Sequence, residues 1–371
     1  MNFLFTCGGT GGHIYPAIAV ADRLKELLPE SDILFVGAED NMELELVPRS
    51  GYAIASVKAS SFHRGMKPGD ILHNLLAIGK NAKALRQSRK IIKAFRPVIA
   101  IGTGGYVCYP VLRMANAMGV KTILHESNAI PGLTTRLLER RVDRVLLGFA
   151  DSAVHFKNAK NIEYTGTPVR EGFRSKSKKK AETGAKVSGK PAVLSVWGSL
   201  GARYMNEKIT EVIAKNEAEG LFSHIHVTGS EESLTTIKKD LAALGHERLK
   251  HTELKSYLHD MPEVMAVCDL VVSRAGAVTL NELASLGKPA ILIPSPYVTG
   301  NHQEKNAVVL RDRGGALMIK EKDCTPALLY RTIAETVKDR EKLRRMSAAM
   351  TTMDAPDATD NIIQSVLNLI K

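Results

Sequence analysis

The sequence has few of the features that mark secreted, zinc-binding or membrane-spanning proteins. Its four cysteines lie far apart without paired spacing, so neither a disulfide framework nor a zinc site is indicated. The uncharged stretch from Val98 to Leu112 has three glycines and a proline and is shorter than the roughly 20 apolar residues that span a bilayer. A glycine-rich loop follows the first few residues without a basic leader, unlike a secretion signal. We expect a cytosolic protein.

Aromatic residues and paired acidic residues are also scarce. Phe, Trp and Tyr make up 5% of the chain, and the net charge is +12. Basic proteins that bind single-stranded nucleic acids interleave aromatic side chains for base stacking, so we expect no nucleic-acid partner. No Asp-x-Asp motif occurs, although Mg²⁺ prefers carboxylate ligands. We expect neither a metal ion nor another cofactor.

The composition is that of a globular protein with two domains. The chain has 371 residues, of which 44% are hydrophobic and 24% charged. A chain of this length is too long to fold around a single hydrophobic core. Strand-length apolar runs alternate with segments of helical periodicity, which is typical of parallel, doubly wound sheets. We expect strands at residues 3–6, 32–36, 98–101, 121–125 and 144–147, and again at 192–196, 223–228, 270–273 and 290–294.

These runs predict an α/β fold of two Rossmann-like domains in tandem. We place the domains at residues 1–166 and 167–371, with a ligand-binding cleft where the carboxyl ends of the two sheets face each other. A last amphipathic helix, over about residues 356–371, could pack back on the first domain. The Lys- and Ser-rich segment Arg174–Lys190 has the composition of an interdomain connection or loop; a specific anion site is the alternative.

Positive charge is concentrated in residues 71–125, which contain nine Lys and Arg residues and no Asp or Glu. Within residues 71–95, apolar side chains recur every three or four positions and most cations fall between them, which predicts a basic amphipathic helix. The predicted apolar stripe consists of Ile71, Leu75, Ile78, Ala82, Leu85 and Ile92. An ordinary surface helix packed on the sheet and a helix that binds anionic lipid both fit this pattern. In the second case the membrane contacts are Leu75, Leu76, Lys80, Lys83, Arg86 and Lys90.

Three glycine-rich loops each follow an expected strand, at Cys7–His13, Gly102–Tyr106 and Trp197–Ala202. Backbone N–H groups at such a loop, together with a helix N-terminus, bind phosphate groups well. Any one loop could be only a tight turn, but three indicate a large phosphorylated ligand. The first loop fits neither the dinucleotide fingerprint, because Tyr15 or Pro16 would replace a small residue, nor a Walker A loop.

Polar residues also gather in later turns, and Glu282 is the most informative of them. It follows Thr279 by three residues, as in a helix capping box. The alternative is a carboxylate that binds both hydroxyls of a ribose, which we favour. Ser199, in the third glycine loop, could likewise cap a helix or donate to a phosphate.

Six motifs follow one another along the chain: GGTGGH, GTGGY, HESN, GSLGA, SRAGAVTLNELASLGKPAILIP and NHQEKNA. In this order they resemble the MurG family of peptidoglycan glycosyltransferases. The resemblance implies a GT-B fold and inverting transfer of N-acetylglucosamine from UDP-GlcNAc to the C4 hydroxyl of MurNAc in lipid I (undecaprenyl-pyrophosphoryl-MurNAc-pentapeptide). The product would be lipid II, used in peptidoglycan synthesis and therefore in cell wall biogenesis, cell shape and cell division.

The resemblance also implies a place in the cell and partners. The N-terminal domain would bind the acceptor and associate peripherally with the cytoplasmic face of the cell membrane. The C-terminal domain would bind UDP-GlcNAc, and other cell-wall synthesis proteins could be further partners. A GT-B lipid glycosyltransferase with a diacylglycerol acceptor, or a non-catalytic nucleotide-sugar-binding protein, remains an alternative.

The resemblance finally implies residue roles. His13 would be the catalytic base, with Glu126 as the alternative. Glu282 would bind the ribose, and Arg170 and the backbone near Leu258 would lie near the uracil. The full set expected to bind the donor is Thr10, Gly11, Gly12, Asn128, Arg170, Ser199, Leu258, Ala277, Thr279, Glu282, His302 and Gln303. The set expected to bind the acceptor pyrophosphate is Gly9, Thr103, Gly104, Gly105 and Tyr106.

The chain departs from the family pattern at four positions. Cys7 and Trp197 stand where glycine is usual, Ser127 where Gln is frequent, and Thr167 where a Gly-Asn-Pro run is usual. Trp197 matters most, because a bulky residue there would limit how closely the third glycine loop approaches a phosphate.

Overall fold

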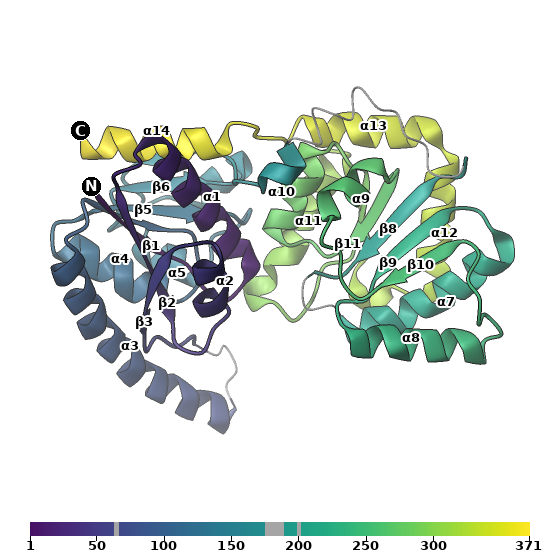
Figure 1. Ribbon diagram of the computed structural model, residues 1–371, viewed down its shortest axis with the longest axis horizontal. Coiled ribbons are helices and arrows are strands. Elements are labelled where there is room, and N and C mark those ends of the chain that lie inside the picture. Colours follow the sequence, from purple (N-terminus) through teal and green to yellow (C-terminus); the bar gives the residue numbers. More distant parts are fainter. Residues whose placement is uncertain (63–66, 175–188, 199–201) are drawn as a thin grey trace. The chain divides into compact units, whose positions relative to one another are not determined.

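The computed structural model describes residues 1–62, 67–174, 189–198 and 202–371, which form two compact units (Figure 1). Unit 1 consists of Met1–Pro168 and Ala355–Lys371, and unit 2 of Val169–Asp354. Each unit contains one sheet of parallel strands with helices on its faces. The predicted α/β fold with two Rossmann-like domains is therefore confirmed.

Unit 1 contains a seven-stranded sheet in the order β3-β2-β1-β4-β5-β6-β7. Its strands are β1 (Asn2–Thr6), β2 (Asp32–Ala38), β3 (Ala53–Val57), β4 (Ile99–Gly102), β5 (Lys121–Glu126), β6 (Arg144–Leu147) and β7 (Ile162–Tyr164). Its helices are α1 (Gly11–Leu27), α2 (Glu43–Arg49), α3 (Pro68–Phe95), α4 (Cys108–Ala117), α5 (Leu133–Leu138), the 3₁₀ turn η1 (Ala150–His155) and α14 (Ala358–Ile370).

The sheet of unit 1 is buried on both faces, which explains why its central strands are continuous apolar runs. In β1, Phe3 and Phe5 point to one face and Leu4 to the other, as the alternation of side chains in a strand requires. The first face is covered by α1, α2 and α14, and the second by α3, α4 and α5. The C-terminal helix α14 thus completes the core of unit 1 by burying Ile362, Ile363 and Val366 (Figure 1).

Unit 2 contains a six-stranded sheet in the order β10-β9-β8-β11-β12-β13. Its strands are β8 (Ala192–Val196), β9 (Ser223–Val227), β10 (Thr252–Lys255), β11 (Leu270–Ser273), β12 (Ala290–Leu292) and β13 (Ala316–Met318). Its helices are α7 (Arg203–Glu219), α8 (Glu231–Ala243), α9 (Met261–Val267), α10 (Ala277–Ser285), α11 (His302–Asp312), α12 (Pro326–Lys338) and α13 (Arg340–Thr351), with 3₁₀ turns η2 (Thr299–Asn301) and η3 (Glu321–Asp323).

Of the strands formed by the described residues, sequence analysis did not predict four, and these are the edge strands of the two sheets: β3 and β7 in unit 1, and β10 and β13 in unit 2. An edge strand pairs on one side only and is less buried, so it needs no long apolar run. Strand β10, for instance, reads Thr-Glu-Leu-Lys, and none of its residues is fully buried. The nine central strands, buried on both faces, were all predicted.

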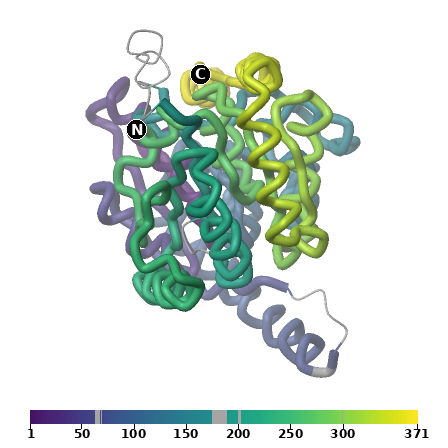
Figure 2. Tube along the Cα trace, turned by 90° about the vertical axis from the view of Figure 1, so that its right-hand side faces the viewer, coloured from purple at the N-terminus to yellow at the C-terminus, as the bar shows by residue number. Residues whose placement is uncertain are grey.

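Helix α3 differs from the prediction in the face that it buries. The predicted apolar stripe included Ile71, Leu75 and Ile78, yet these side chains are 53%, 62% and 59% exposed. Ile92 of the predicted stripe is buried, together with Ala77, Ala84 and Ser88, and these three small residues let the helix approach α4 closely. The first turns of α3 extend away from the sheet of unit 1 (Figure 2). They carry three exposed leucines, Leu72, Leu75 and Leu76.

Among the described residues, no helix combines the length and the hydrophobicity needed to span a membrane.

Candidate functional site

The first and second glycine loops pack directly against each other at the carboxyl ends of β1 and β4. The backbone N–H of Gly8 donates to the carbonyl of Gly104 at 3.2 Å. A Cβ atom on Gly105 would lie 2.3 Å from the carbonyl oxygen of Gly8, so the contact requires glycine. Gly105 also has a φ of +91°, a conformation that other residues rarely adopt. Two loops distant in sequence therefore form one backbone surface.

His13 lies in the first turn of α1, beside both loops. Its Nδ1 is 2.8 Å from the carbonyl oxygen of Gly8. Since a carbonyl can only accept, Nδ1 carries the proton, and in the neutral imidazole Nε2 carries the lone pair. A Cβ on Gly104 would lie 2.8 Å from Nε2, so this nitrogen is next to the second loop. Thr103 fixes the same turn by donating its hydroxyl to the carbonyl of His13 at 2.7 Å.

The remaining residues of the two loops are close to His13. Thr10 is the N-cap residue of α1 but makes no capping hydrogen bond with its side chain. The N–H groups of Gly11 and Gly12 lie in the first helical turn, where intrahelical acceptors are missing. The hydroxyl of Tyr106 accepts a hydrogen bond from Asn41 at 2.6 Å. The structure thus brings together Thr10, Gly11, Gly12, His13, Thr103, Gly104, Gly105 and Tyr106, all named from the sequence.

Gly9 behaves differently from its predicted neighbours. Its N–H donates to the Glu43 carboxylate at 3.1 Å and is therefore not available to a phosphate. Sequence analysis missed Glu43, because a single acid at the start of a short helix has no motif. Its carboxylate is fully buried and also accepts the N–H of Ala38 at 2.9 Å.

Glu126, the alternative base, is held by four hydrogen bonds at the end of β5. It accepts the N–H and the side-chain amide of Asn128 at 3.0 and 2.9 Å, the N–H of Gly132 at 3.0 Å and the hydroxyl of Thr135 at 2.6 Å. These donors occupy both oxygens, and the side chain is 5% exposed. Asn128 is therefore positioned by Glu126, and the arrangement favours His13 as the base.

In unit 2, Glu282 forms an ion pair with Arg170. Oε1 of Glu282 is 2.9 Å from Nε and 2.8 Å from Nη2 of Arg170. Burial raises the pKa of Glu282, while the Arg170 guanidinium opposes this shift. The capping-box alternative is wrong, since α10 has Gly276 as its N-cap and Thr279 makes no capping hydrogen bond. Glu282 is thus a buried carboxylate whose cationic partner is Arg170.

Gln303 joins the loops that follow β11 and β12. Its side-chain oxygen accepts the N–H of Ser295 at 2.9 Å and that of Ala275 at 3.3 Å. Arg274, which sequence analysis did not single out, donates to the carbonyl of Ile293 at 3.0 Å and pairs with the buried Glu321 at 2.5 Å. The motif SRAGAV contains Arg274, but its acidic partner comes from η3, far along the chain. These contacts tie together the carboxyl ends of three strands.

The other predicted donor residues lie on neighbouring elements of unit 2. Ala277 and Thr279 are in the first turn of α10, His302 begins α11, and Leu258 is buried in the turn after β10. Ser199 and most of Arg174–Lys190 lie outside the described residues. Trp197 points into the core of unit 2, where it is 3% exposed, so its side chain does not occupy the surface of the loop.

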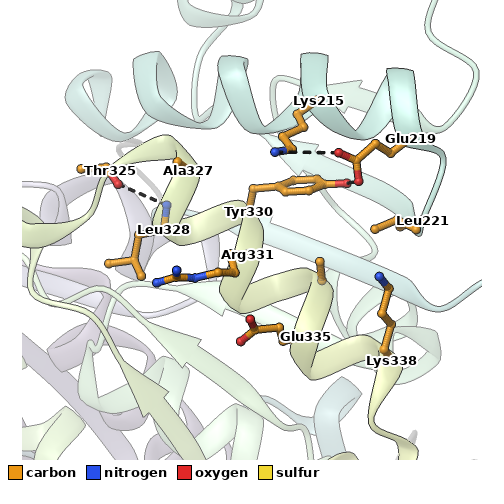
Figure 3. A pocket seen from close by; sticks show the side chains of 11 residues that line it. Lys215, Glu219, Leu221, Thr325, Ala327, Leu328, Tyr330, Arg331, Glu335 and Lys338 are labelled. Atoms are coloured by element: carbon orange, nitrogen blue, oxygen red, sulfur yellow. Dashed lines mark hydrogen bonds and ion pairs between the residues drawn. The ribbon is translucent and has the colours of Figure 1, made fainter.

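A surface groove between α7 and α12 contains none of the predicted site residues (Figure 3). Three of the polar groups that line it are partnered with one another: Tyr330 donates to Glu219 at 2.8 Å, and Lys215 lies 3.8 Å from the same carboxylate. We assign no ligand to this groove. In the part of the chain that the structure describes, no group of three or more His, Cys, Asp or Glu residues is placed to hold a metal ion.

Two Rossmann-like units, each with one parallel sheet, form the architecture of the GT-B fold, and the family matches place the chain among the glycosyltransferases. Residues 3–147 match the glycosyltransferase family 28 N-terminal domain, and residues 192–362 match the glycosyltransferase family 28 C-terminal domain. The chain belongs to this family and, within it, to the MurG-type N-acetylglucosamine transferases.

Curated relatives match over the full length. The UDP-N-acetylglucosamine–N-acetylmuramyl-(pentapeptide) pyrophosphoryl-undecaprenol N-acetylglucosamine transferase of Acetivibrio thermocellus is 38% identical, over 100% of this chain and 99% of the relative. The enzyme of the same name from Alkaliphilus metalliredigens is 39% identical over 100% of both chains. The crystal structure of MurG from Acinetobacter baumannii has the same fold, with a TM-score of 0.80, 24% identity and 99% coverage of both chains.

Proposed function

We propose that this chain transfers N-acetylglucosamine from UDP-GlcNAc to the C4 hydroxyl of MurNAc in lipid I and so forms lipid II. The observation that carries the proposal is the end-to-end identity of 38–39% with transferases that are named for this reaction. Such a transfer needs a base for the acceptor hydroxyl and a means of stabilising the departing UDP. A single displacement converts an α-linked donor into a β-linked product.

His13 is the proposed base. Because Nδ1 donates to Gly8, Nε2 keeps its lone pair and can accept the proton of the acceptor hydroxyl as the glycosidic bond forms. The proton then resides on an imidazolium whose second N–H remains bonded to a carbonyl oxygen. Glu126, with both oxygens engaged by four donors, offers no comparable free lone pair toward a substrate.

The acceptor pyrophosphate is assigned to unit 1. The candidates are the N–H groups of Gly11 and Gly12, which the sequence analysis assigned to the donor and which lie at the positive end of the α1 dipole, and those of the second loop from Gly104 to Tyr106. The N–H of Thr103 is not among them, since it donates to the carbonyl of Thr6 at 3.1 Å. Both sets lie beside His13, next to which the acceptor hydroxyl must be placed. Gly9 is omitted, since its N–H is bonded to Glu43.

The donor nucleotide is assigned to unit 2. Glu282 would accept hydrogen bonds from the two ribose hydroxyls, for which an ionised carboxylate is required. Arg170 supports that ionisation in a buried position, so we assign it to Glu282 as well as to the neighbourhood of the uracil. Loop N–H groups and helix dipoles at α10 and α11 would stabilise the charge of the departing UDP.

We also propose peripheral binding to the cytoplasmic face of an anionic membrane through α3. Its first turns expose five large apolar side chains: Ile71, Leu72, Leu75, Leu76 and Ile78. The cations Lys80, Lys83, Arg86 and Lys90 follow on the same helix and are exposed. An apolar edge beside cations suits shallow insertion among anionic headgroups. A lipid-linked acceptor stays in the bilayer, so the enzyme must come to it.

The deciding experiment measures transfer of radiolabelled N-acetylglucosamine from UDP-GlcNAc to a lipid I analogue, with diacylglycerol in a parallel reaction. Label in a product of lipid II size supports the proposal. Label only in a glycosylated diacylglycerol would indicate the other lipid acceptor. Binding of UDP-GlcNAc without transfer to either acceptor would indicate a non-catalytic nucleotide-sugar-binding protein.

A further inference from the structure

The structure places a charged side chain behind the proposed base. Glu43, at the start of α2, is 0% exposed, and no Lys or Arg of the described chain forms an ion pair with it. Its two oxygens accept the N–H groups of Ala38 and Gly9 at 2.9 and 3.1 Å. Burying a carboxylate without a cation is costly, so such a group calls for an explanation.

One peptide group connects Glu43 to His13. The peptide between Gly8 and Gly9 donates its N–H to Glu43 and accepts Nδ1–H of His13 on its carbonyl oxygen at 2.8 Å. In a trans peptide the N–H and C=O groups point in opposite directions within the peptide plane, so the carboxylate and the imidazole bind to opposite edges of the same peptide group.

We infer that Glu43 is a positioning residue, which acts through this peptide to keep the proton of neutral His13 on Nδ1 and the lone pair on Nε2. The inference rests on the proposed role of His13 as the base. A negative charge at the N–H end polarises the peptide and strengthens its carbonyl as an acceptor. The arrangement does for His13 what a directly bonded carboxylate does for the histidine of a catalytic triad.

Glu43 also prevents the peptide from rotating. Gly9 has a φ of +84°, and glycine can adopt several backbone conformations that would turn this peptide over. A turned peptide would present its carbonyl to the Glu43 carboxylate, which is repulsive, and an N–H to His13. Nδ1 would then have to accept, and Nε2 would lose its lone pair.

The local sequence is adapted to this buried carboxylate. A Cβ on Gly8 would lie 2.5 Å from Oε1 of Glu43, and a Cβ on Gly37 would lie 2.5 Å from its Cγ. Both positions must therefore be glycine while Glu43 is in place.

The titratable neighbours of the pair are uncharged near neutral pH. Burial raises the pKa of Cys7 and Tyr106 and raises that of Cys108 to about 12, and Glu43 faces all three. Burial lowers the pKa of His125, which faces His13. These four neighbours therefore bring no charge of their own next to Glu43 or His13.

The test uses Glu43→Gln, which keeps the shape of the side chain but offers one acceptor oxygen to two N–H donors. The control is Glu45→Gln, on the same helix but in an exposed ion pair with Arg49. Long-range ¹H–¹⁵N spectra of histidine-labelled protein, with His13 assigned from the His13→Gln spectrum, report which ring nitrogen carries the proton.

We expect Nδ1–H in the wild type and in Glu45→Gln, and a shift toward Nε2–H in Glu43→Gln. A wild-type spectrum with Nε2–H overturns the inference even if the variant does not fold. An unchanged His13 spectrum in folded Glu43→Gln overturns it as well. Because this readout needs no substrate, it stays valid if the proposed transferase activity fails.

Measurements of transferase activity are the second test. In Glu43→Gln we expect kcat to fall about 10- to 100-fold, part of the 10²- to 10⁴-fold that a general base contributes. The KM for UDP-GlcNAc should stay near the wild-type value. In a His13→Ala background the same change should have no further effect on kcat. An equal loss in both backgrounds would show that Glu43 does not act through His13.

Discussion

At the scale of single residues, the chemistry proposed for this chain depends on buried or half-buried polar groups with defined partners. His13 is bonded through Nδ1, Glu282 is paired with Arg170, and Glu126 is enclosed by four donors. Each residue type was evident from the sequence. The partners were not, because they come from other elements, and they decide what each group can do.

Replacing His13 by Ala is expected to lower kcat for transfer to a lipid I analogue by about 100-fold or more, as for loss of a general base. The KM for UDP-GlcNAc should change little, since the nucleotide is assigned to unit 2. Steady-state kinetics at varied donor concentration distinguish the two parameters. A rise in KM with an unchanged kcat would make His13 a binding residue and leave the base unidentified.

Replacing Glu282 by Ala is expected to weaken UDP-GlcNAc binding by about 100-fold or more. It removes two charge-assisted hydrogen bonds of roughly 1.5 to 3 kcal/mol each, and 1.4 kcal/mol corresponds to a factor of ten. Titration calorimetry measures the affinity, and thermal melting shows whether the fold survives. The control is Glu335→Ala, which replaces an exposed carboxylate of α12. This variant should bind UDP-GlcNAc as the wild type does. Unchanged affinity in Glu282→Ala would refute the ribose assignment.

At the scale of elements, α3 shows why helical periodicity alone does not identify the buried face. Its apolar residues recur at helical spacing, yet the packed face is a row of small side chains centred on Ala84. The first turns of the helix extend past the sheet (Figure 2), and the large apolar side chains there are exposed. Periodicity predicts that a helix forms, whereas the neighbouring helix α4 decides which side it covers.

Changing Lys80, Lys83, Arg86 and Lys90 to Gln should reduce co-sedimentation with anionic liposomes and make the remaining binding less sensitive to salt. Each cation near an anionic surface contributes about 1 kcal/mol, and this attraction is screened by salt. UDP-GlcNAc affinity should stay the same. The matched control removes four exposed lysines of unit 2: Lys238, Lys239, Lys250 and Lys322. Equal liposome binding by both variants would show that α3 is an ordinary surface helix and does not bind the membrane.

At the scale of the whole molecule, the two units have the same architecture but differ in their buried polar groups. Unit 2 buries Ser195 between two histidines of β9, at 2.8 Å from Nε2 of His224 and 2.7 Å from Nδ1 of His226. Burial lowers the pKa of His224 to about 3 and that of His226 well below its usual value. Both imidazoles are therefore neutral in the folded unit at neutral pH.

Unit 2 should consequently lose stability in acid. The unfolded chain binds a proton on each histidine near pH 6.5, but the folded unit does not, so the stability present above pH 6.5 declines as the pH falls toward about 3. Each histidine contributes up to about 1.4 kcal/mol per pH unit in that window.

Urea unfolding at pH 7.5 and pH 5 measures this loss. Trp197 is the only tryptophan, and its ring is 6.3 Å from that of His226, so its fluorescence reports on unit 2. Replacing His224 and His226 by Phe and Val should reduce the pH dependence. A urea midpoint in the wild type that does not change between the two pH values would contradict the prediction.

The sequence by itself determined the class of fold, the central strands and the positions of the glycine loops. These features are local: an apolar run, a helical period or a glycine turn is encoded by neighbouring residues. The tertiary structure decided the contacts that pair residues far apart in the chain, such as Glu43 with Gly9, Arg170 with Glu282, and the small-residue face of α3 with α4. Such contacts depend on where each element packs, because a buried charge or carbonyl is satisfied only by the groups that folding brings within hydrogen-bonding distance.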